Sequence, residues 1–327
     1  MGEKLLITGG SGFLAFHVIE EALKQGYEVH VSIRPSSSTA HLKALDITYI
    51  KINFSDVNAI KDQLEKEQYN YVIHTAGTTK AANQQEYNKV NATYTSNLAQ
   101  AASTANIPLK KFVFVSSLAA IGPAGESEII HEKKAMRPVT GYGKSKMLAE
   151  EMLLGIEDLP LIIIRPTAVY GPRERDLLIV LKAIVRGLEP YIGNKPQQLS
   201  FIYVKDLAKL MVDALHSPVT GMVYNISDGK VYDKFALATI TKKIMGNKTL
   251  RFHLPVFVVN MLAGLLEAAS IVSKKTPALN RDKINELTAS WACSIDAAKQ
   301  DLNFLPQYDL QSGLQETLQW YKVNKWI

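Results

Sequence analysis

Short apolar runs alternate with longer amphipathic stretches through the first half of the chain. Runs that are apolar on both faces are typical of strands buried within a parallel sheet. We expect six such strands, at residues 5–8, 28–33, 48–52, 71–74, 111–115 and 161–164. One helix is predicted to begin at Phe13, and a second to follow a cap at 53–56 and end at Glu67. Two more are predicted at 84–105 and 142–154. This alternation predicts the α/β fold class with a doubly wound parallel sheet.

The character of the sequence changes after Pro166. A polar loop at 171–176 precedes a predicted helix at 177–186, and two further strands, 201–204 and 222–225, flank a helix at 205–216. From about Val231 we expect helices and loops without paired strands. The predicted division is a nucleotide-binding domain at 1–170, to which 199–229 return, and a smaller, mostly helical substrate domain at 171–198 and 230–327.

Three glycines, Gly9, Gly10 and Gly12, lie between the first predicted strand and the first helix. They fit Gly10-x-Gly12-x-x-Ala15 or Gly9-x-x-Gly12-x-x-Ala15. A turn of this kind lets the backbone approach a pyrophosphate, whose charge the helix N-terminus stabilises. A tight turn without a ligand is the alternative, but the position after the first strand favours dinucleotide binding in a Rossmann fold.

Composition excludes few classes of protein. The 327 residues carry a formal charge of +6, and the basic residues are scattered, so a nucleic-acid surface is not expected. The single cysteine, Cys293, excludes an intramolecular disulfide and favours a buried thiol in a reducing compartment. No secretory signal is recognised and no metal site is predicted, so a cytoplasmic protein is expected.

One long apolar segment covers residues 254–272 and is interrupted by Asn260, Glu267 and Ser270. It approaches the length of a membrane span, but the acidic residue argues against one. We interpret it as a helix packed on the substrate domain. The alternative is a helix that contacts a membrane surface or lines a lipid-like pocket.

Candidate chemistry gathers after the fifth predicted strand. Tyr142 and Lys146 are four residues apart and share one helix face. A nearby ammonium stabilises a phenolate, and lowering a tyrosine pKa from about 10 to 7 requires about 4 kcal/mol. Ser116 and Ser117 end the strand, where a hydroxyl can donate to a developing oxyanion. Each pattern is common alone, and only their shared context favours a catalytic site.

The chain resembles an extended short-chain dehydrogenase/reductase of the NAD-dependent epimerase/dehydratase family. Within it, dihydroflavonol-reductase-like and 3β-hydroxysteroid-dehydrogenase-like members are most alike. The matching segments follow in order: TGGSGFLA at Thr8, VIHTAG at Val72, VNATYTSNLAQAA at Val90, FVFVSS at Phe112, YGKSK at Tyr142, RPTAVYGP at Arg165, LSFIYVKDLA at Leu199 and YNISDG at Tyr224.

The resemblance implies roles for individual residues. Tyr142 would be the catalytic acid or base, with Lys146 tuning it, Ser117 polarising the substrate carbonyl and Asn91 behind the site. Contacts to the cofactor are expected from Gly9, Gly10, Ser11, Gly12, Phe13, Leu14, Arg34, Asn53, Phe54, Thr75, Ala76, Gly77, Ser116, Tyr142, Lys146, Pro166 and Val169. It also implies a homodimer formed through the 84–105 helix and the Tyr142 helix.

Three departures from the family pattern bear on the cofactor. Arg34 stands where NAD-preferring members carry an acidic residue, and a guanidinium suits a 2′-phosphate. NADP(H) is therefore the predicted cofactor, with NAD(H) as the alternative. Asn53 replaces an aspartate near the adenine and keeps hydrogen-bonding capacity. Tyr94 replaces a common glycine, for which the sequence offers no explanation.

Several reactions stay open within the family. Nucleotide-sugar enzymes typically carry an Arg-Asp pair where this chain has Leu199 and Ser200. We therefore expect hydride transfer between NADP(H) and a ketone, aldehyde or alcohol on an apolar small molecule. A nucleotide-sugar epimerase or dehydratase with tightly bound cofactor is the first alternative. A non-catalytic NADP(H)-sensing protein is the second, against which the intact Ser117, Tyr142 and Lys146 argue.

Overall fold

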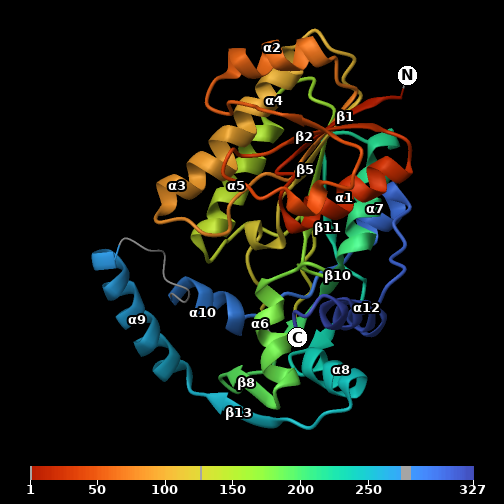
Figure 1. Ribbon diagram of the computed structural model, residues 1–327. Coiled ribbons are helices and arrows are strands. Elements are labelled where there is room, and N and C mark those ends of the chain that lie inside the picture. Colours follow the sequence, from red (N-terminus) through yellow and green to blue (C-terminus); the bar gives the residue numbers. More distant parts are fainter. Residues whose placement is uncertain (1, 126, 274–280) are drawn as a thin grey trace.

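A seven-stranded parallel sheet forms the centre of the molecule in a computed structural model, which describes residues 2–125, 127–273 and 281–327 (Figure 1). The strand order is β11-β6-β5-β4-β1-β2-β3. It confirms the predicted doubly wound Rossmann fold, with β2 and β3 ending earlier than expected. The strands are β1 (Lys4–Thr8), β2 (Glu28–Ser32), β3 (Thr48–Ile50), β4 (Tyr71–His74), β5 (Lys111–Val115), β6 (Leu161–Pro166) and β11 (Met222–Ile226).

Helices cover both faces of this sheet. On one face α1 (Phe13–Lys24) packs against α7 (Val204–Asp213), and on the other α4 (Tyr94–Thr104) packs against α2 (Val57–Glu67) and α5 (Gly141–Leu154). Neighbouring strand residues therefore enter different cores: Ile7 belongs to one buried cluster and Leu6 to the other. Chain order reverses at β1, so the carboxyl ends of β1 and β4 flank the crevice where such sheets bind ligands.

The helix expected at 84–105 is interrupted. It consists of α3 (Gln84–Asn88), a π-helical turn at Lys89–Thr93 and α4. Inside the turn, the Asn91 side chain accepts a hydrogen bond from the Thr78 N–H at 2.7 Å and donates one to the Thr78 carbonyl at 2.9 Å. This pairing draws the backbone toward the loop after β4, where π-turns often mark functional positions.

Three small two-stranded sheets lie beyond the central sheet. The expectation that no strands pair after Val231 is wrong, because β12 (Tyr232–Asp233) pairs with β9 (Gln198–Leu199) and β13 (Leu250–Leu254) with β8 (Leu188–Ile192). The third pair joins β7 (Ala168–Tyr170) to β10 (Phe201–Tyr203). The helices of this region are α6 (Asp176–Val185), α8 (Ala236–Met245), α11 (Asp296–Leu302) and α12 (Leu310–Val323).

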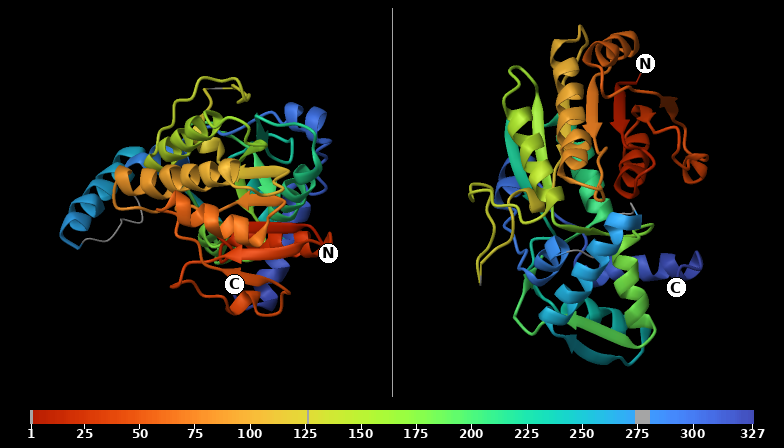
Figure 2. Two further views of the ribbon diagram at one scale, coloured as in Figure 1. Left: turned by 90° about the horizontal axis from the view of Figure 1, so that it is seen from above. Right: turned by 90° about the vertical axis from the view of Figure 1, so that its left-hand side faces the viewer.

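The long apolar segment forms α9 (Val256–Ser273), which extends along the outside of the molecule near α10 (Arg281–Thr288) (Figures 1 and 2). Val259 and Ala263 are buried in a small cluster with Ile284, whereas the next helix face is exposed. The predicted packing of this segment on the rest of the protein therefore holds for the face of α9 that carries Val259 and Ala263. The side chains of α9 from position 266 onward lie outside the described part of the structure. Among the described residues, no helix has the length and apolarity to cross a membrane.

Candidate active site

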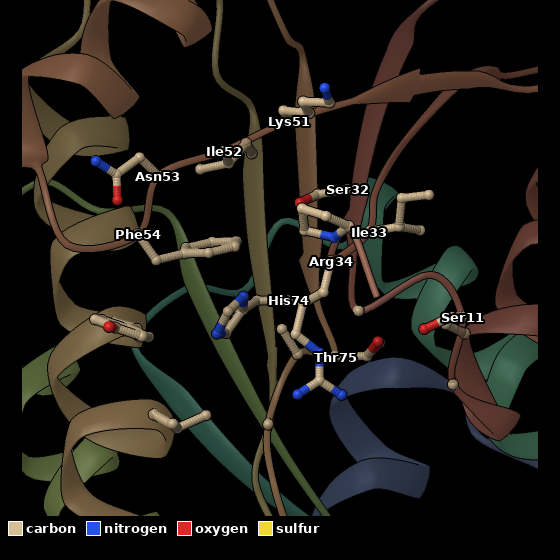
Figure 3. Close-up of a pocket in the computed structure, with 18 of the residues that line it drawn as sticks. Ser11, Ser32, Ile33, Arg34, Lys51, Ile52, Asn53, Phe54, His74 and Thr75 are labelled. Atoms are coloured by element: carbon tan, nitrogen blue, oxygen red, sulfur yellow. The ribbon is translucent and has the colours of Figure 1, made fainter. Parts of the chain in front are cut away.

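A cavity of about 740 Å³ lies along the carboxyl ends of β1 to β4 (Figure 3). Most of the residues expected to contact a cofactor line it. These are Gly9, Ser11, Gly12, Phe13, Leu14, Arg34, Asn53, Phe54, Thr75, Ala76 and Gly77.

The glycine turn places backbone directly against this cavity. Gly9 has a φ of +73°, and a Cβ there would lie 2.7 Å from the Cα of Ala76, so only glycine fits without displacement. A Cβ on Gly10 would collide with the Val31 side chain. Gly10 does not line the cavity, and its role in the fold is to let the turn pack against β2.

The first helix presents an open N-terminus to the same space. Gly12 is the N-cap of α1, without a side-chain cap, and the first turn holds no acidic residue. The early N–H groups of a helix have no partners within it and attract anions together with the helix dipole. This end of the cavity is therefore suited to a phosphate.

The charged lining of the cavity is entirely basic. Arg34 and Lys51 line it, and none of the described lining residues is Asp or Glu. In Figure 3 the guanidinium of Arg34 extends alongside Thr75, while the Lys51 amine points away from it. At the end of β2 the described lining therefore offers a guanidinium and no carboxylate.

Aromatic side chains form the opposite wall. The rings of Phe54 and Tyr94 stack with centroids 6.4 Å apart, and both line the cavity. Tyr94, which the sequence left unexplained, thus adds ring surface where a glycine would leave space. Sequence reasoning also missed several other lining residues: Ser32, Ile33, Pro35, Lys51, Ile52, Ser55, His74 and Val90.

His74 is held neutral beneath the cavity. Its ring nitrogens lie 2.7 Å from the Thr8 hydroxyl and 2.9 Å from the Thr95 hydroxyl. Burial, with a smaller contribution from the charge of Lys146, lowers the pKa of His74 to about 3. His74 therefore connects β1 to α4 without carrying charge at neutral pH. Its place at the end of β4 was the available signal in the sequence.

The two hydroxyl side chains predicted for catalysis, Ser117 and Tyr142, lie near each other. Ser117, which follows β5, lies close enough to Tyr142, in the first turn of α5, to lower the pKa of the Tyr142 phenol. Burial raises the pKa of Tyr142 to about 12, against the lowering effect of the nearby Ser117 hydroxyl. The sequence argument expected a lowered pKa. That expectation included the charge of a bound nicotinamide besides Lys146 and stays a prediction, while in the protein by itself burial outweighs the contact with Ser117.

Lys146 lies one helical turn below Tyr142 and is almost fully buried. Its ammonium donates to the Val115 carbonyl at 2.8 Å and lies 4.7 Å from the centroid of the Phe114 ring. Burial lowers the pKa of Lys146 to about 8, although Glu150 acts in the opposite direction. A Cβ on Gly77 would be 3.5 Å from the Lys146 Nζ, so the ammonium adjoins the cavity wall.

Ser116 has a structural partner instead. Its hydroxyl donates to Glu150, which forms a buried ion pair with Arg165. Ser116, Tyr142, Lys146, Pro166 and Val169 do not line the cavity, so their expected contacts with a cofactor stay predictions.

Both the oxygen and the nitrogen of the Asn91 side-chain amide are hydrogen-bonded to other protein groups. Besides its bonds to Thr78, it donates to the Ser145 hydroxyl at 2.9 Å. It thereby connects the loop after β4 to the helix that carries Tyr142 and Lys146.

Comparison with known proteins identifies the family. The model of the NAD dependent epimerase/dehydratase family matches residues 5–227, which include the glycine turn, Ser117, Tyr142 and Lys146. The chain belongs to this family. The match confirms that the protein is an enzyme of the extended short-chain dehydrogenase/reductase type.

Relatives within the NAD dependent epimerase/dehydratase family have diverse activities. The chain is 25% identical to the decarboxylating sterol-4-alpha-carboxylate 3-dehydrogenase of Candida albicans, with 97% of each chain covered. It is 26% identical to the ceramide reductase of Caulobacter vibrioides, covering 98% of this chain and 95% of that protein. The structure of UDP-glucose 4-epimerase from Thermotoga maritima has the same fold, with a TM-score of 0.81, 21% identity and coverage of 98% and 99%.

Proposed function

We propose that the protein is an NADP(H)-dependent oxidoreductase that interconverts a ketone or aldehyde and an alcohol on an apolar small molecule. The juxtaposition of Ser117 and Tyr142 carries this proposal, because Lys146, on the same helix as Tyr142, places its ammonium beside Gly77 of the cavity wall. Two hydroxyls and a cation beside a nucleotide pocket are suited to carbonyl reduction.

The lining of the cavity has groups suited to the pyrophosphate and the 2′-phosphate of NADP(H). Gly9 and Gly12 would hold the pyrophosphate against backbone, and Arg34 would pair with a 2′-phosphate. The wall of Phe54 and Tyr94 provides ring surface for the adenine end. When bound, the nicotinamide supplies or accepts the hydride.

The chain's own residues would handle the proton. With a pKa raised to about 12, Tyr142 is a neutral phenol at pH 7 and can donate its proton to the substrate oxygen. Ser117 would hydrogen bond the same oxygen as negative charge develops on it. Lys146 is mostly protonated at pH 7, and its charge stabilises the phenolate that proton donation leaves behind.

The surroundings favour an apolar substrate over a nucleotide sugar. Leu199 and Ser200 are neutral, and the buried Ser200 hydroxyl donates to the Lys230 carbonyl, so neither can bind a diphosphate as an arginine would. The names of two relatives, a sterol-carboxylate dehydrogenase and a ceramide reductase, also refer to lipid substrates.

The test is NADPH oxidation during a screen of apolar ketones and aldehydes. We expect a stoichiometric loss of nicotinamide absorbance, and Tyr142→Phe is expected to slow it by about 10²–10⁴-fold while NADPH binding persists. Tyr27→Phe, at the distant amino end of β2, is the matched control and should retain activity. Unchanged turnover in Tyr142→Phe would contradict the proposal, as would substrate conversion without net change in absorbance.

We further propose a homodimer formed through α4 and α5, because α5 exposes Met152 and Leu154. Light scattering of wild type and Leu154→Glu tests it, with a monomeric wild type as the contrary result.

A further inference from the structure

One face of the β8/β13 pair is apolar along its whole length. The two strands are parallel, with Leu188 opposite Leu250, and side chains alternate between the two faces. The residues on the apolar face are Leu188, Pro190, Ile192, Leu250, Phe252 and Leu254. Leu188, Leu250 and Leu254 are 46%, 68% and 39% exposed, whereas Ile192 packs against the cluster of Val259, Ala263 and Ile284.

The opposite face of the pair is polar and has partners. Glu189 accepts from Arg251 at 2.8 Å and from Lys242 of α8 at 2.7 Å. Tyr191 stacks on His253 and donates to Glu189. Glu189 is buried on this polar face, while Arg251 and His253 keep exposed surface, so the apolar face is not the better covered of the two.

Helix α9 carries a second strip of exposed apolar side chains. It begins two residues after β13, and the two elements follow one another along the outside of the molecule (Figures 1 and 2). Phe257, Met261 and Leu265 are spaced four apart and are 73%, 60% and 63% exposed. We call these three side chains and the apolar face of β8/β13 the outer apolar face. Exposed apolar side chains gathered on neighbouring elements in this way are typical of interaction sites.

Positive charge accompanies the outer apolar face. Arg186 and Lys248 precede Leu188 and Leu250 by two positions and are exposed. Within the described part of the chain, neither has a carboxylate within ion-pair distance.

We propose that the outer apolar face docks on an anionic lipid membrane, with α9 lying in the plane of the interface. Apolar side chains would enter the boundary between headgroups and acyl chains, and the cations would contact the headgroups. Charge favours this occupant over a second copy of the chain. A symmetric contact through this face would bring the unpaired cations Arg186 and Lys248 of both copies together.

The test is flotation of the full-length protein with lipid vesicles. We expect binding to vesicles of phosphatidylcholine mixed with phosphatidylglycerol, and weak binding to phosphatidylcholine alone. The double variant Phe257→Glu/Met261→Glu is expected to lower the bound fraction at least about tenfold. The double variant Arg186→Glu/Lys248→Glu is expected to bind the anionic vesicles more weakly. The binding that remains should depend less on salt concentration than that of wild type.

Leu305→Glu is the matched control, since Leu305 is 70% exposed but lies beside α7. It should bind as wild type does, and circular dichroism should show that every variant is folded. Three results would overturn the proposal. These are no binding of folded wild type, equal binding of Phe257→Glu/Met261→Glu, or a wild-type dimer that this variant dissociates.

Discussion

The side-chain amide of Asn91 donates a hydrogen bond to the hydroxyl of Ser145 at 2.9 Å. This bond joins the π-helical turn to α5 between Tyr142 and Lys146. Asn91 is fully buried, and its other bonds fix the loop that continues from Gly77. We therefore regard it as a positioning residue that sets the distance between the catalytic helix and the cavity wall.

Asn91→Ala is expected to lower kcat by about 10–100-fold while the affinity for NADPH changes little. It should also lower the free energy of unfolding by about 2–4 kcal/mol, because three hydrogen bonds are lost, two to the partly buried backbone of Thr78 and one to the buried Ser145 hydroxyl. Denaturant unfolding and steady-state kinetics measure both. The control is Asn88→Ala, one turn earlier, which loses one bond to Gln84 and should cost under about 1 kcal/mol. Equal effects of the two variants would refute the positioning role.

Gly10→Ala should destabilise the fold rather than weaken cofactor binding directly. The new methyl group would collide with Val31 on β2, so we expect a loss of about 1–3 kcal/mol in the free energy of unfolding. Gly155→Ala is the matched control, because its nearest neighbour would be 3.6 Å away. Thermal melts compare the two, and a Gly10→Ala protein as stable as wild type would show that the packing argument is mistaken.

Lys146 links catalysis to stability through pH. Below about pH 8 it is charged in both folded and unfolded states, so the cost of burying the charge is fully present. Between about pH 8 and its ordinary pKa of 10.5, only the unfolded chain binds the proton, so stability contributed by this site rises with pH.

Lys146→Met should therefore be more stable than wild type at pH 7, by at most about 3 kcal/mol, while losing activity. The difference should shrink as the pH approaches 10. Chemical denaturation across this range checks it, with the exposed Lys144→Met as the control that should change neither stability nor its pH dependence. A variant that is less stable at pH 7, or a pH-independent difference, would contradict the burial cost.

The sequence predicted the central sheet well because its signals are local. Each strand is a short apolar run, the glycine turn occupies consecutive positions, and Tyr142 and Lys146 share a helix face by spacing alone. Their position next to Ser117 followed from the rule that parallel strands end at the same edge of the sheet.

The remaining features depend on partners far away in the chain. Leu250 pairs with Leu188 across a separation that no sequence window spans, so β13 was missed. The π-turn depends on Asn91 meeting Thr78, and the raised pKa of Tyr142 depends on how deeply the fold buries it. Tyr94 acquires a role only when Phe54 is brought beside it.

The most direct test of the central claim is calorimetric titration of NADPH and of NADH into wild type and Arg34→Ala. The account predicts one site per chain and a Kd for NADPH at least about tenfold below that for NADH, because a guanidinium–phosphate pair is charge-assisted and frequently bidentate. Arg34→Ala should remove the preference by weakening NADPH alone, while Arg186→Ala, remote from the cavity, should leave it intact. Tighter binding of NADH by wild type, or an unchanged preference in Arg34→Ala, would contradict the account.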